Sequence, residues 1–338
     1  MSRGGVGVRG EVRVRPFEPG DEPAVLRLLS RALGPGPAGE RSAASFRWKH
    51  LENPFGRSVM LVALQGDAIV GVRALMRWRF RVGDVAVRAL RPVDTATAPE
   101  AQGRGVFTRL TAAALEDASA EHDLVFNTPN EKSLGGYLKL GWRRVGVLPV
   151  RVDVTRPVAF LRAMPWRGGT DLEPARRPPE VRAERAGDVL SELGTGVAAS
   201  ELVNRLVTEV SPEYLAWRYA RAPMTYHAVA ERERGVAVFR VRSRGRAWEA
   251  TLAELFVRPG DVRTARRLVR AVARASGADH VSLAPPHGST PARAVARRTF
   301  RVPGGIVLVA RRAAEVSLPL DPFDVASWGV GLGDLEVF

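Results

Sequence analysis

Hydrophobic and polar positions repeat with two different periods along the first half of the chain, and the changes of period separate strands from helices. Apolar residues at every second position predict strands, whereas the spacing of Val25, Leu26 and Leu29 predicts an amphipathic helix. The first expected elements are a strand ending at Pro16, a helix from about Asp21, and a helix within ERSAASFRWKHLENPFG that ends at Pro54. Three strands follow: SVMLVAL and AIVGVRALMRWRF, which are joined by a turn at Gly66 and Asp67, and the long strand DVAVRALRPVDTAT.

Further elements follow that long strand. A helix begins near Val106, DLVFNTP is a short buried strand, and EKSLGGYLKLG is a helix closed by Gly141. WRRVGVLPVRVDV then completes the sheet as a strand with an irregularity at Pro149. This order predicts a mixed α/β domain with a central, mostly antiparallel sheet and helices on both of its faces.

The pattern starts again after the proline-rich and charged segment DLEPARRPPE. VRAERAGD echoes the earlier VRPFEPGD, and LAWRYARAP echoes FRWKHLENP, with the same interval from Trp48 to Pro54 as from Trp217 to Pro223. Strand-like and helix-like runs follow in the order of the first half and end with the strand GGIVLVARR. Units of this size indicate two copies of one domain rather than a solenoid.

We therefore expect two tandem domains, each large enough to bury its own core. The apolar content of 45% and the absence of long proline, serine or glutamine tracts indicate a folded chain. The expected boundaries are a first domain at residues 1–155, a linker at 156–179, a second domain at 180–312 and a C-terminal tail at 313–338.

Composition narrows the possible chemistry. The chain has no cysteine, which excludes disulfides, a cysteine nucleophile and cysteine-ligated zinc, and its five histidines lack metal-ligand spacing. No apolar run approaches the roughly 18 to 20 residues of a membrane helix, and the N-terminus lacks a signal-peptide core, so we expect a cytoplasmic protein without a metal. The formal charge of +15 comes almost entirely from arginine, which is typical of a GC-rich genome; an acidic partner is the alternative interpretation.

The stretch QGRGVF joins the long strand to the helix after it. Gly103 and Gly105 leave the backbone open to a ligand, and the free N–H groups at a helix start form an anion site suited to a pyrophosphate. An ordinary strand-to-helix turn is the alternative. A dinucleotide-binding fingerprint does not fit, because the third glycine and the acidic ribose partner are missing, and the Gly-Lys-Ser/Thr of a P-loop is absent.

A pattern that begins at Gln102 fits better. QGRGVF resembles the Gln/Arg-x-x-Gly-x-Gly/Ala signature of the GNAT N-acyltransferase superfamily, and departs from it at Phe107, where the family has glycine or alanine. NEKSLGGYLKLGW matches a second spacing of that family, with Asn130, Ser133, Tyr137, Gly141 and Trp142 in register. The resemblance covers Val12 to about Val154 and extends to the second copy only in layout.

The resemblance implies a role for each of these positions. Asn130 is expected to touch the pantetheine arm of coenzyme A, and Tyr137 to protonate the departing thiolate; packing of Tyr137 on the sheet is the alternative. The main chain of Thr95, Ala96 and Thr97 is expected to line the pantetheine. The pyrophosphate is expected to be held by Gln102, Gly103, Arg104, Gly105, Val106, Phe107 and Thr108.

The base that deprotonates the acceptor amine is less well marked. Asp94 lies on the strand that leads to the motif, and a structural turn carboxylate is the alternative role for it. The chain ends with the apolar tail WGVGLGDLEVF, whose terminal carboxylate at Phe338 is a second candidate, since resemblance to tandem GNAT enzymes of the enhanced-intracellular-survival type implies that it reaches the first active site.

The second copy lacks these motifs. RPGDVR, which matches the glycine motif in position, has no Gly-x-Gly, and Asp261 places a carboxylate where a phosphate is expected. Counting back from Phe300, Asn130 maps to Gly288 and Tyr137 to Val295, so this site is expected to be inactive. Its helix carries a basic stripe, which is either a solvated face or a dock for an acidic donor: Arg263, Arg266, Arg267, Arg270 and Arg274.

These expectations combine into a tandem GNAT acyltransferase, monomeric or homodimeric, without a metal. It is expected to move an acyl group, most simply acetyl, from coenzyme A to an amine of a small molecule or peptide by direct attack on the thioester. One alternative keeps the fold and takes the acyl group from an acyl carrier protein or an aminoacyl-tRNA. Another is a non-catalytic acyl-coenzyme A sensor or partner subunit.

Overall fold

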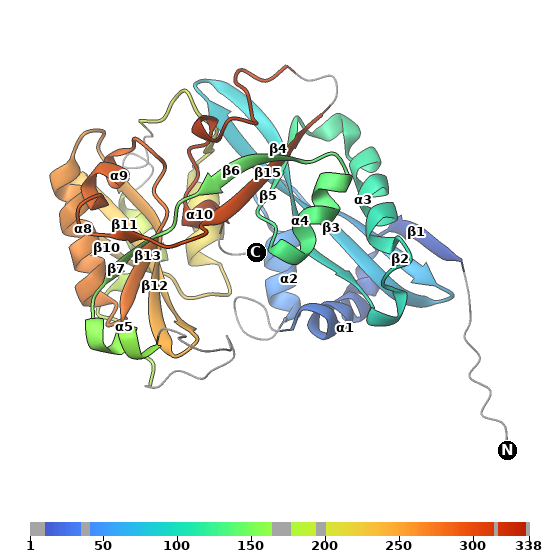
Figure 1. The fold of residues 1–338 in the computed structure, drawn as a ribbon, viewed down its shortest axis with the longest axis horizontal. Helices are drawn as coiled ribbons and strands as arrows, with labels where there is room; N and C mark the ends of the chain where they lie inside the picture. The colour runs from blue at the N-terminus through green and yellow to red at the C-terminus, as the bar shows by residue number, and fades with distance from the viewer. Residues whose placement is uncertain (1–10, 35–40, 164–176, 194–200, 314–316, 336–338) are drawn as a thin grey trace.

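A computed structural model of the chain describes residues 11–34, 41–163, 177–193, 201–313 and 317–335, which form two mixed sheets with helices packed on them. The first sheet forms the lobe on the right of Figure 1 and has the order β1-β2-β3-β4-β5-β15-β6, with the two-residue strand β9 (Val207–Thr208) paired to β3. Its strands are β1 (Val12–Pro16), β2 (Val59–Gln65), β3 (Ala68–Val82), β4 (Val85–Thr97), β5 (Leu124–Asn127), β15 (Ile306–Arg312) and β6 (Arg143–Leu148).

The second sheet repeats this order position by position. It reads β8-β10-β11-β12-β13-β7-β14, so that each strand has a counterpart in the first sheet. Its strands are β8 (Glu184–Arg185), β10 (His227–Ala230), β11 (Gly235–Arg244), β12 (Ala247–Val257), β13 (His280–Leu283), β7 (Arg151–Val154) and β14 (Phe300–Arg301). In both sheets the hairpin pairs are antiparallel and one central pair, β4 with β5 or β12 with β13, is parallel.

The two sheets exchange a strand, which sequence analysis did not anticipate. WRRVGVLPVRVDV does not complete one sheet: β6 stays in the first, whereas β7 crosses over and pairs with β13 and β14 in the second. GGIVLVARR makes the reverse crossing, and β15 lies between β5 and β6. Alternation along a strand records which faces it buries but not which neighbour it pairs with, so the pattern gives no sign of the exchange.

Helices cover both sheets, as the mixed α/β prediction requires. In the first lobe α1 packs on β3 and β4, and α3 packs on β2 and β3; in the second lobe α8 packs on β11 and β12. The helices are α1 (Glu22–Leu33), α2 (Ala43–His50), α3 (Val106–Asp117), α4 (Glu131–Lys139), α5 (Pro157–Ala163), α6 (Ala186–Leu193), α7 (Pro212–Leu215), α8 (Val262–Ala275), α9 (Thr290–Val295) and α10 (Leu332–Leu335), with a π-helical turn at Ala216–Ala220.

The tryptophans that marked the sequence repeat meet at the interface between the lobes. The rings of Trp48 and Trp217 stack with centroids 4.9 Å apart, and each indole N–H donates to the other residue's carbonyl oxygen at 2.8 Å. This reciprocity is what an approximate two-fold axis between the copies produces. A single hydrophobic core runs across the interface, including Trp78 and Phe126 from the first half with Tyr214 and Trp328 from the second.

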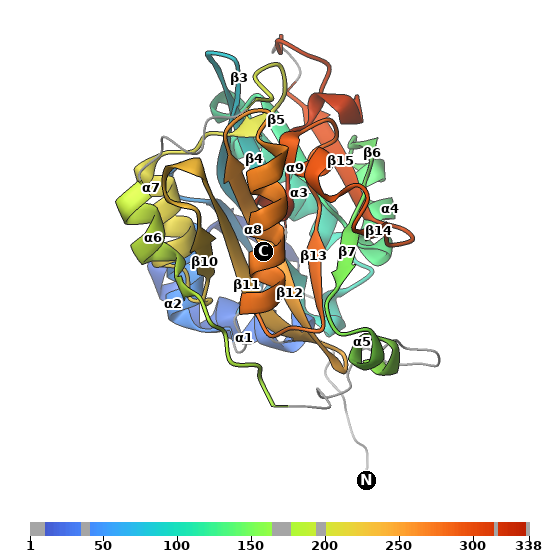
Figure 2. The same cartoon turned by 90° about the vertical axis from the view of Figure 1, so that its left-hand side faces the viewer.

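The segment expected to be a linker is partly helical, since it contains α5, and residues 164–176 lie outside the described part. In Figure 2, α5 lies at the lower end of the second sheet, next to the end of β12. The strand exchange gives each sheet strands from both halves, and the expected domain boundaries stay a prediction. Within the described ranges, no helix has the length and apolar character needed to span a membrane.

Candidate active site

The long strand β4 separates from its parallel neighbour β5 partway along its length. The two strands pair only at Ala89 with Leu124 and at Leu90 with Val125, although β4 continues to Thr97. A register shift opposite Arg73 then bulges β4, where Asp94 takes a positive φ of 41°. Because bulges are common next to active sites, the gap between the diverging strands β4 and β5 is a candidate ligand site.

Residues Thr95, Ala96 and Thr97 form the end of β4 beyond the bulge. Ala96 and Thr97 still pair with β3, and the carbonyl of Thr97 accepts a hydrogen bond from Gln102 Nε2 at 3.2 Å. This contact joins the strand end to the glycine loop that follows. The structure therefore brings together the two segments that sequence analysis assigned to the pantetheine and the pyrophosphate.

The glycine loop ends in an uncapped helix start. Gly103 and Gly105 have φ values of 75° and 72°, the left-handed region that favours glycine, and Gln102 to Gly105 are exposed. Gly105 is the N-cap of α3, and no side chain caps its first amides. The N–H groups of Val106, Phe107 and Thr108 lie in the first turn of the helix, where they have no intrahelical acceptor, and the helix dipole favours an anion there.

Phe107, the departure from the family motif, is accommodated by a glycine on α4. A side-chain carbon added to Gly136 would lie 3.3 Å from the Phe107 ring, so the ring occupies the space that a larger residue at 136 would take. Phe107 also meets the Tyr137 ring edge-on at a centroid distance of 5.9 Å.

Helix α4 positions the two residues of the second motif. Asn130 is its N-cap, and Asn130 Oδ1 accepts from the Ser133 amide at 3.0 Å while the residue remains exposed. Tyr137, seven residues on, is only 4% exposed and packs against Trp142. The sequence spacing thus places an exposed cap at the start of α4 and a buried phenol in its last turn.

Arg73 on β3 is a site residue that sequence analysis missed. It is fully buried, and its Nη1 donates to Thr95 Oγ1 at 2.9 Å and to Tyr137 Oη at 3.2 Å. Its guanidinium lies over the rings of Phe107 and Tyr137, while Nε and Nη2 have no hydrogen-bond partner in the described structure. Buried unpaired donors are costly, which favours a polar ligand group beside them. The signal in the sequence was one arginine within the apolar run AIVGVRAL.

Asp94 lies at the bulge but is surrounded by cations. Its carboxylate contacts Lys49 Nζ at 2.7 Å, Arg41 Nη1 at 3.0 Å and His50 Nε2 at 3.0 Å. Burial raises the pKa of Asp94, but Lys49 and His50 outweigh it and hold that pKa below the ordinary value. Burial in turn lowers the pKa of His50, which also contacts Ser58. A carboxylate so paired is a weak base, and the geometry favours a role in holding the bulge.

The C-terminal segment runs toward the same gap. Arg91, buried on β4, donates to the carbonyl oxygens of Asp334 and Leu335, the latter at 2.6 Å, and its Nη2 lies 3.4 Å from Thr128 Oγ1 just after β5. The described tail thus ends beside the diverging strands. Phe338, the candidate terminal base, lies outside the described residues.

The matching region of the second copy is built differently. Four residues, Arg258 to Asp261, join β12 to α8, whereas eight join β4 to α3. Asp261 caps α8 and accepts from Thr264 N at 3.0 Å and from its hydroxyl at 2.6 Å, and these bonds lower the pKa of Asp261. The cap of the next helix is Ser289, one residue after the position obtained by counting from Phe300.

The donor set of the first copy fits coenzyme A better than a metal. The open loop and uncapped helix start suit a pyrophosphate, and the separation of β4 from β5 suits an extended arm. In the described ranges, no group of three or more histidine, aspartate or glutamate side chains could hold a metal ion.

Comparisons with known proteins point to the same region. A family model described as "Acetyltransferase (GNAT) domain" matches residues 13–145. Similar solved structures include a GCN5-related N-acetyltransferase from Kribbella flavida (18% identity, TM-score 0.57, covering 90% of this chain and 72% of that one). Eis1 from Mycobacterium abscessus is also similar, with 16% identity and a TM-score of 0.54, covering 90% of this chain and 74% of that one. A GCN5-related N-acetyltransferase from Anabaena variabilis has 12% identity and a TM-score of 0.61, covering 90% of this chain and 73% of that one. No curated protein matches the chain by sequence.

Proposed function

Residues 13–145 belong to the GNAT acetyltransferase family, and from this premise we propose that the protein is an acyl-coenzyme A-dependent N-acyltransferase. The donor is acetyl-coenzyme A in the simplest case, and the acceptor is an amine of a small molecule or peptide. The family match covers the first part of the chain and supports acyl transfer; the reaction, the donor, the acceptor and the cytoplasmic location belong to the proposal.

One observation carries the proposal, namely that an uncapped helix start follows β4 while a buried phenol is joined to the same strand through Arg73. Gly105 opens α3 with free amides, and Tyr137 lies 3.2 Å from Arg73, which also donates to Thr95. A pyrophosphate at the first point and a thioester near the second are the two ends of one acyl-coenzyme A. An ordinary turn needs the glycines but gives no reason for the buried phenol and arginine.

In the proposed reaction the amine nitrogen attacks the thioester carbonyl, the C–S bond breaks, and the thiolate leaves. Tyr137 donates its proton to that thiolate, a task that suits a phenol because the ordinary pKa values of phenols and alkyl thiols are similar. Arg73 holds the Tyr137 hydroxyl and Thr95, and its unpartnered N–H groups stabilise the negative charge that develops nearby.

The amine must lose its own proton to a base. Asp94 is poorly suited, because its cationic partners keep its pKa low. The carboxylate of Phe338 remains a candidate, supported by the tail that Arg91 holds beside the gap. Truncation of the last three residues tests this role, since it should lower turnover without changing coenzyme A affinity if the terminal carboxylate is the base.

A matched pair of glycine substitutions tests the proposal. Gly105 and Gly260 both have positive φ, both lie just before a helix, and nothing lies within 4 Å of a side-chain carbon added to either. Gly105→Asp places a carboxylate at the proposed pyrophosphate site and should weaken coenzyme A binding by at least about 100-fold, because like charges a few ångströms apart repel by several kcal/mol near a surface. Gly260→Asp carries the same backbone strain and should leave binding unchanged.

Isothermal titration calorimetry with coenzyme A measures both variants, and thiol release from acetyl-coenzyme A with a panel of amines measures turnover. Equal affinity in Gly105→Asp and the parent would refute the site. Tight coenzyme A binding by the parent without turnover of any amine favours the sensor alternative instead.

A carrier-protein or tRNA donor receives less support. The arginine stripe of α8 is exposed, as sequence analysis expected, but Arg267 is paired with Glu231 and Arg266 donates to the carbonyl of Ala294. Binding of such a donor should fall steeply between about 0.05 and 0.2 M salt, whereas turnover of free acetyl-coenzyme A should not. Sedimentation of the active protein distinguishes the two expected states, a monomer and a homodimer.

A further inference from the structure

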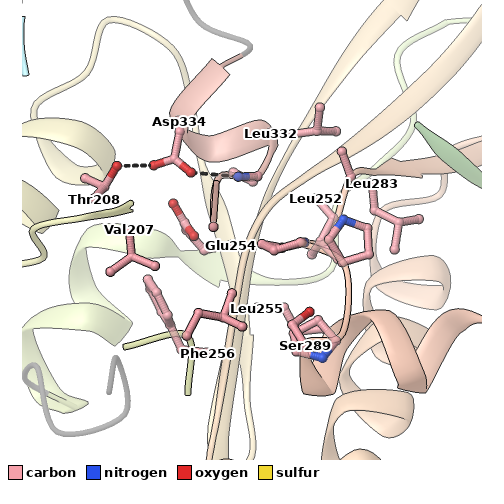
Figure 3. A pocket seen from close by; sticks show the side chains of 18 of the residues that line it. Val207, Thr208, Leu252, Glu254, Leu255, Phe256, Leu283, Ser289, Leu332 and Asp334 are labelled. Atoms are coloured by element: carbon pink, nitrogen blue, oxygen red, sulfur yellow. Dashed lines mark hydrogen bonds between the residues drawn. The ribbon is translucent and has the colours of Figure 1, made fainter. Parts of the chain in front are cut away.

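A cavity of about 160 Å³ lies in the second copy, where β12 and β13 diverge (Figure 3). The two strands are paired from Glu249 to Thr251 and separate after that point. The cavity is lined by the remainder of β12, by the residues after β13, by Thr208 and Tyr214, and by the tail at Gly331 to Asp334. It therefore lies where the first copy has its proposed pantetheine gap.

Coenzyme A does not fit this second gap. The loop before α8 is four residues shorter than its counterpart, and Asp261 occupies the helix start with a carboxylate. The tail residue Leu332 also closes one side of the cavity. The gap in the second copy has a largely apolar interior but no phosphate site.

The charge of the lining is opposite to that of the protein. Glu201, Glu254 and Asp334 line the cavity and no lysine, arginine or histidine does, although the chain has a formal charge of +15. Two of these carboxylates are already engaged: Glu201 accepts from the amide and hydroxyl of Thr290, and Asp334 from Thr208 Oγ1 at 2.6 Å and Gly331 N at 2.7 Å.

Glu254 differs from the other two. Its Oε1 accepts a hydrogen bond from the Tyr219 hydroxyl at 2.5 Å, and no cation is paired with it in the described structure. Burial, reinforced by the nearby Asp334 carboxylate, raises the pKa of Glu254 to about 8. The other charged and titratable groups that act on it are Arg218 and Tyr214, and Arg218 donates to the carbonyl of Gly333 rather than to Glu254.

Most of the remaining lining is apolar and includes Leu252, Leu255, Phe256, Leu283 and Leu332, while Thr208, Tyr214 and Ser289 add hydroxyl groups. An apolar cavity of about 150 Å³ is large enough to hold benzene. The complementary ligand is thus one ring or a short branched chain that carries a cationic group.

We propose that this cavity binds a small apolar primary amine, with the ammonium group at Glu254 and the hydrocarbon body among the leucines. A desolvated ammonium–carboxylate pair is favourable when it is hydrogen-bonded, and here Tyr219 supports the carboxylate. The residues that line the cavity do not include those assigned to the acyl-transfer site, and the proposal does not depend on that activity.

Calorimetric titration of the intact protein at pH 7 with benzylamine and with neutral benzyl alcohol tests the proposal. We expect the amine to bind at least about 10-fold more tightly than the alcohol. Glu254→Gln keeps the shape of the side chain and should abolish that preference without changing alcohol binding, whereas Glu231→Gln on the surface should change neither. Because benzylamine could also enter the first site as an acceptor, the Glu254 variant identifies the binding site.

Equal affinity of the parent for amine and alcohol, or an unchanged preference in Glu254→Gln, would overturn the proposal. If the variant does not fold, the parent alone suffices, since an ammonium group that ionises Glu254 at pH 7 must release a proton. Titration in two buffers of different ionisation enthalpy measures this release. Release of close to one proton per amine bound supports the contact, whereas no release together with equal affinity for amine and alcohol contradicts it.

Discussion

Asp94 and Glu254 occupy matching positions in the two copies but have opposite electrostatics. Asp94 lies six residues after Arg88, whose amide donates to Asp123 just before β5 at 2.8 Å. Glu254 lies six residues after Trp248, whose amide donates to Asp279 just before β13 at 3.0 Å. Around Asp94 the Lys49 ammonium group and the hydrogen-bonded His50 hold the pKa low against burial, whereas around Glu254 burial and a second carboxylate raise it. The two copies therefore share the backbone arrangement at this position, but their surroundings shift the pKa of the carboxyl group in opposite directions.

The loops before α3 and α8 show the same divergence. Gly105 leaves the first turn of α3 uncapped, and Asp261 caps α8 with a carboxylate. The first amides of α3 are therefore free to bind an anion, whereas an amide in the first turn of α8 is hydrogen-bonded to the Asp261 side chain. The comparison teaches that sheet order can persist through a duplication while loops and caps decide what each copy binds.

The largest expected effect comes from separating the copies. Residues 1–155 alone lack β15, which lies between β5 and β6, so β6 loses its neighbour and the core is opened. We expect this fragment to show no cooperative unfolding transition by circular dichroism. Adding residues 156–338 as a second chain should restore the transition, and a cooperative transition in the fragment alone would contradict the role given to the exchange.

The matched carboxyl groups should differ in their contribution to stability. Asp94→Asn removes the carboxylate charge that pairs with Lys49 and Arg41 and should lower the free energy of unfolding by about 3–5 kcal/mol. Glu254→Gln replaces a largely protonated carboxyl group by an amide of the same shape and should cost about 1 kcal/mol or less at pH 7. Urea unfolding measures both, and equal costs would show that the environments are not opposed.

Tyr137→Phe should lower kcat by about 100-fold or more, because loss of a general acid typically costs that much. The ring contacts with Phe107 and Trp142 are retained, so coenzyme A affinity should not change. Tyr219→Phe, which removes a hydroxyl from the second copy, is the control and should leave kcat within about two-fold. Similar rates in the parent and Tyr137→Phe would exclude the proposed proton donor.

The last expected effect is a pH dependence. The pKa of Glu254 in the folded protein, about 8, lies above its ordinary value of 4.5, so between these pH values the folded state holds a proton that the unfolded state has released. The contribution of this bound proton to the free energy of unfolding is complete below pH 4.5, the ordinary pKa. It is lost as the pH rises toward 8, by up to about 1.4 kcal/mol per pH unit.

The difference in unfolding free energy between the parent and Glu254→Gln, measured from pH 5 to 8, isolates this contribution. It should fall with rising pH; a flat difference would mean that the carboxyl group is already ionised. Asp94 does not interfere in this range, because its lowered pKa confines its titration to lower pH.

Sequence patterns predicted most of the fold because most of it is local. Period-2 and period-3.6 runs gave the strands and helices of the first lobe, and the spacing from Asn130 to Tyr137 follows from one short helix. The strand exchange was missed because β7 and β15 bury the same residues whichever sheet they join.

The missed parts of the site depend on distant residues. The partners of Asp94 come from α2 and the segment before it, more than 40 residues earlier in the chain. The second-copy cavity is enclosed by segments from Glu201 to Asp334. Arg73 could have been noticed as a charge in an apolar strand, but only the fold shows that it touches Tyr137.

The strand exchange also sets the order of events during synthesis. The place between β5 and β6 is filled by Ile306–Arg312, which leave the ribosome after about 160 further residues, on the order of 10 s at typical elongation rates. Until then the facing edges of β5 and β6 expose unpaired N–H and C=O groups, the kind of edge that recruits other strands. We therefore expect the nascent first half to be prone to pairing with other chains until its own last strand is available.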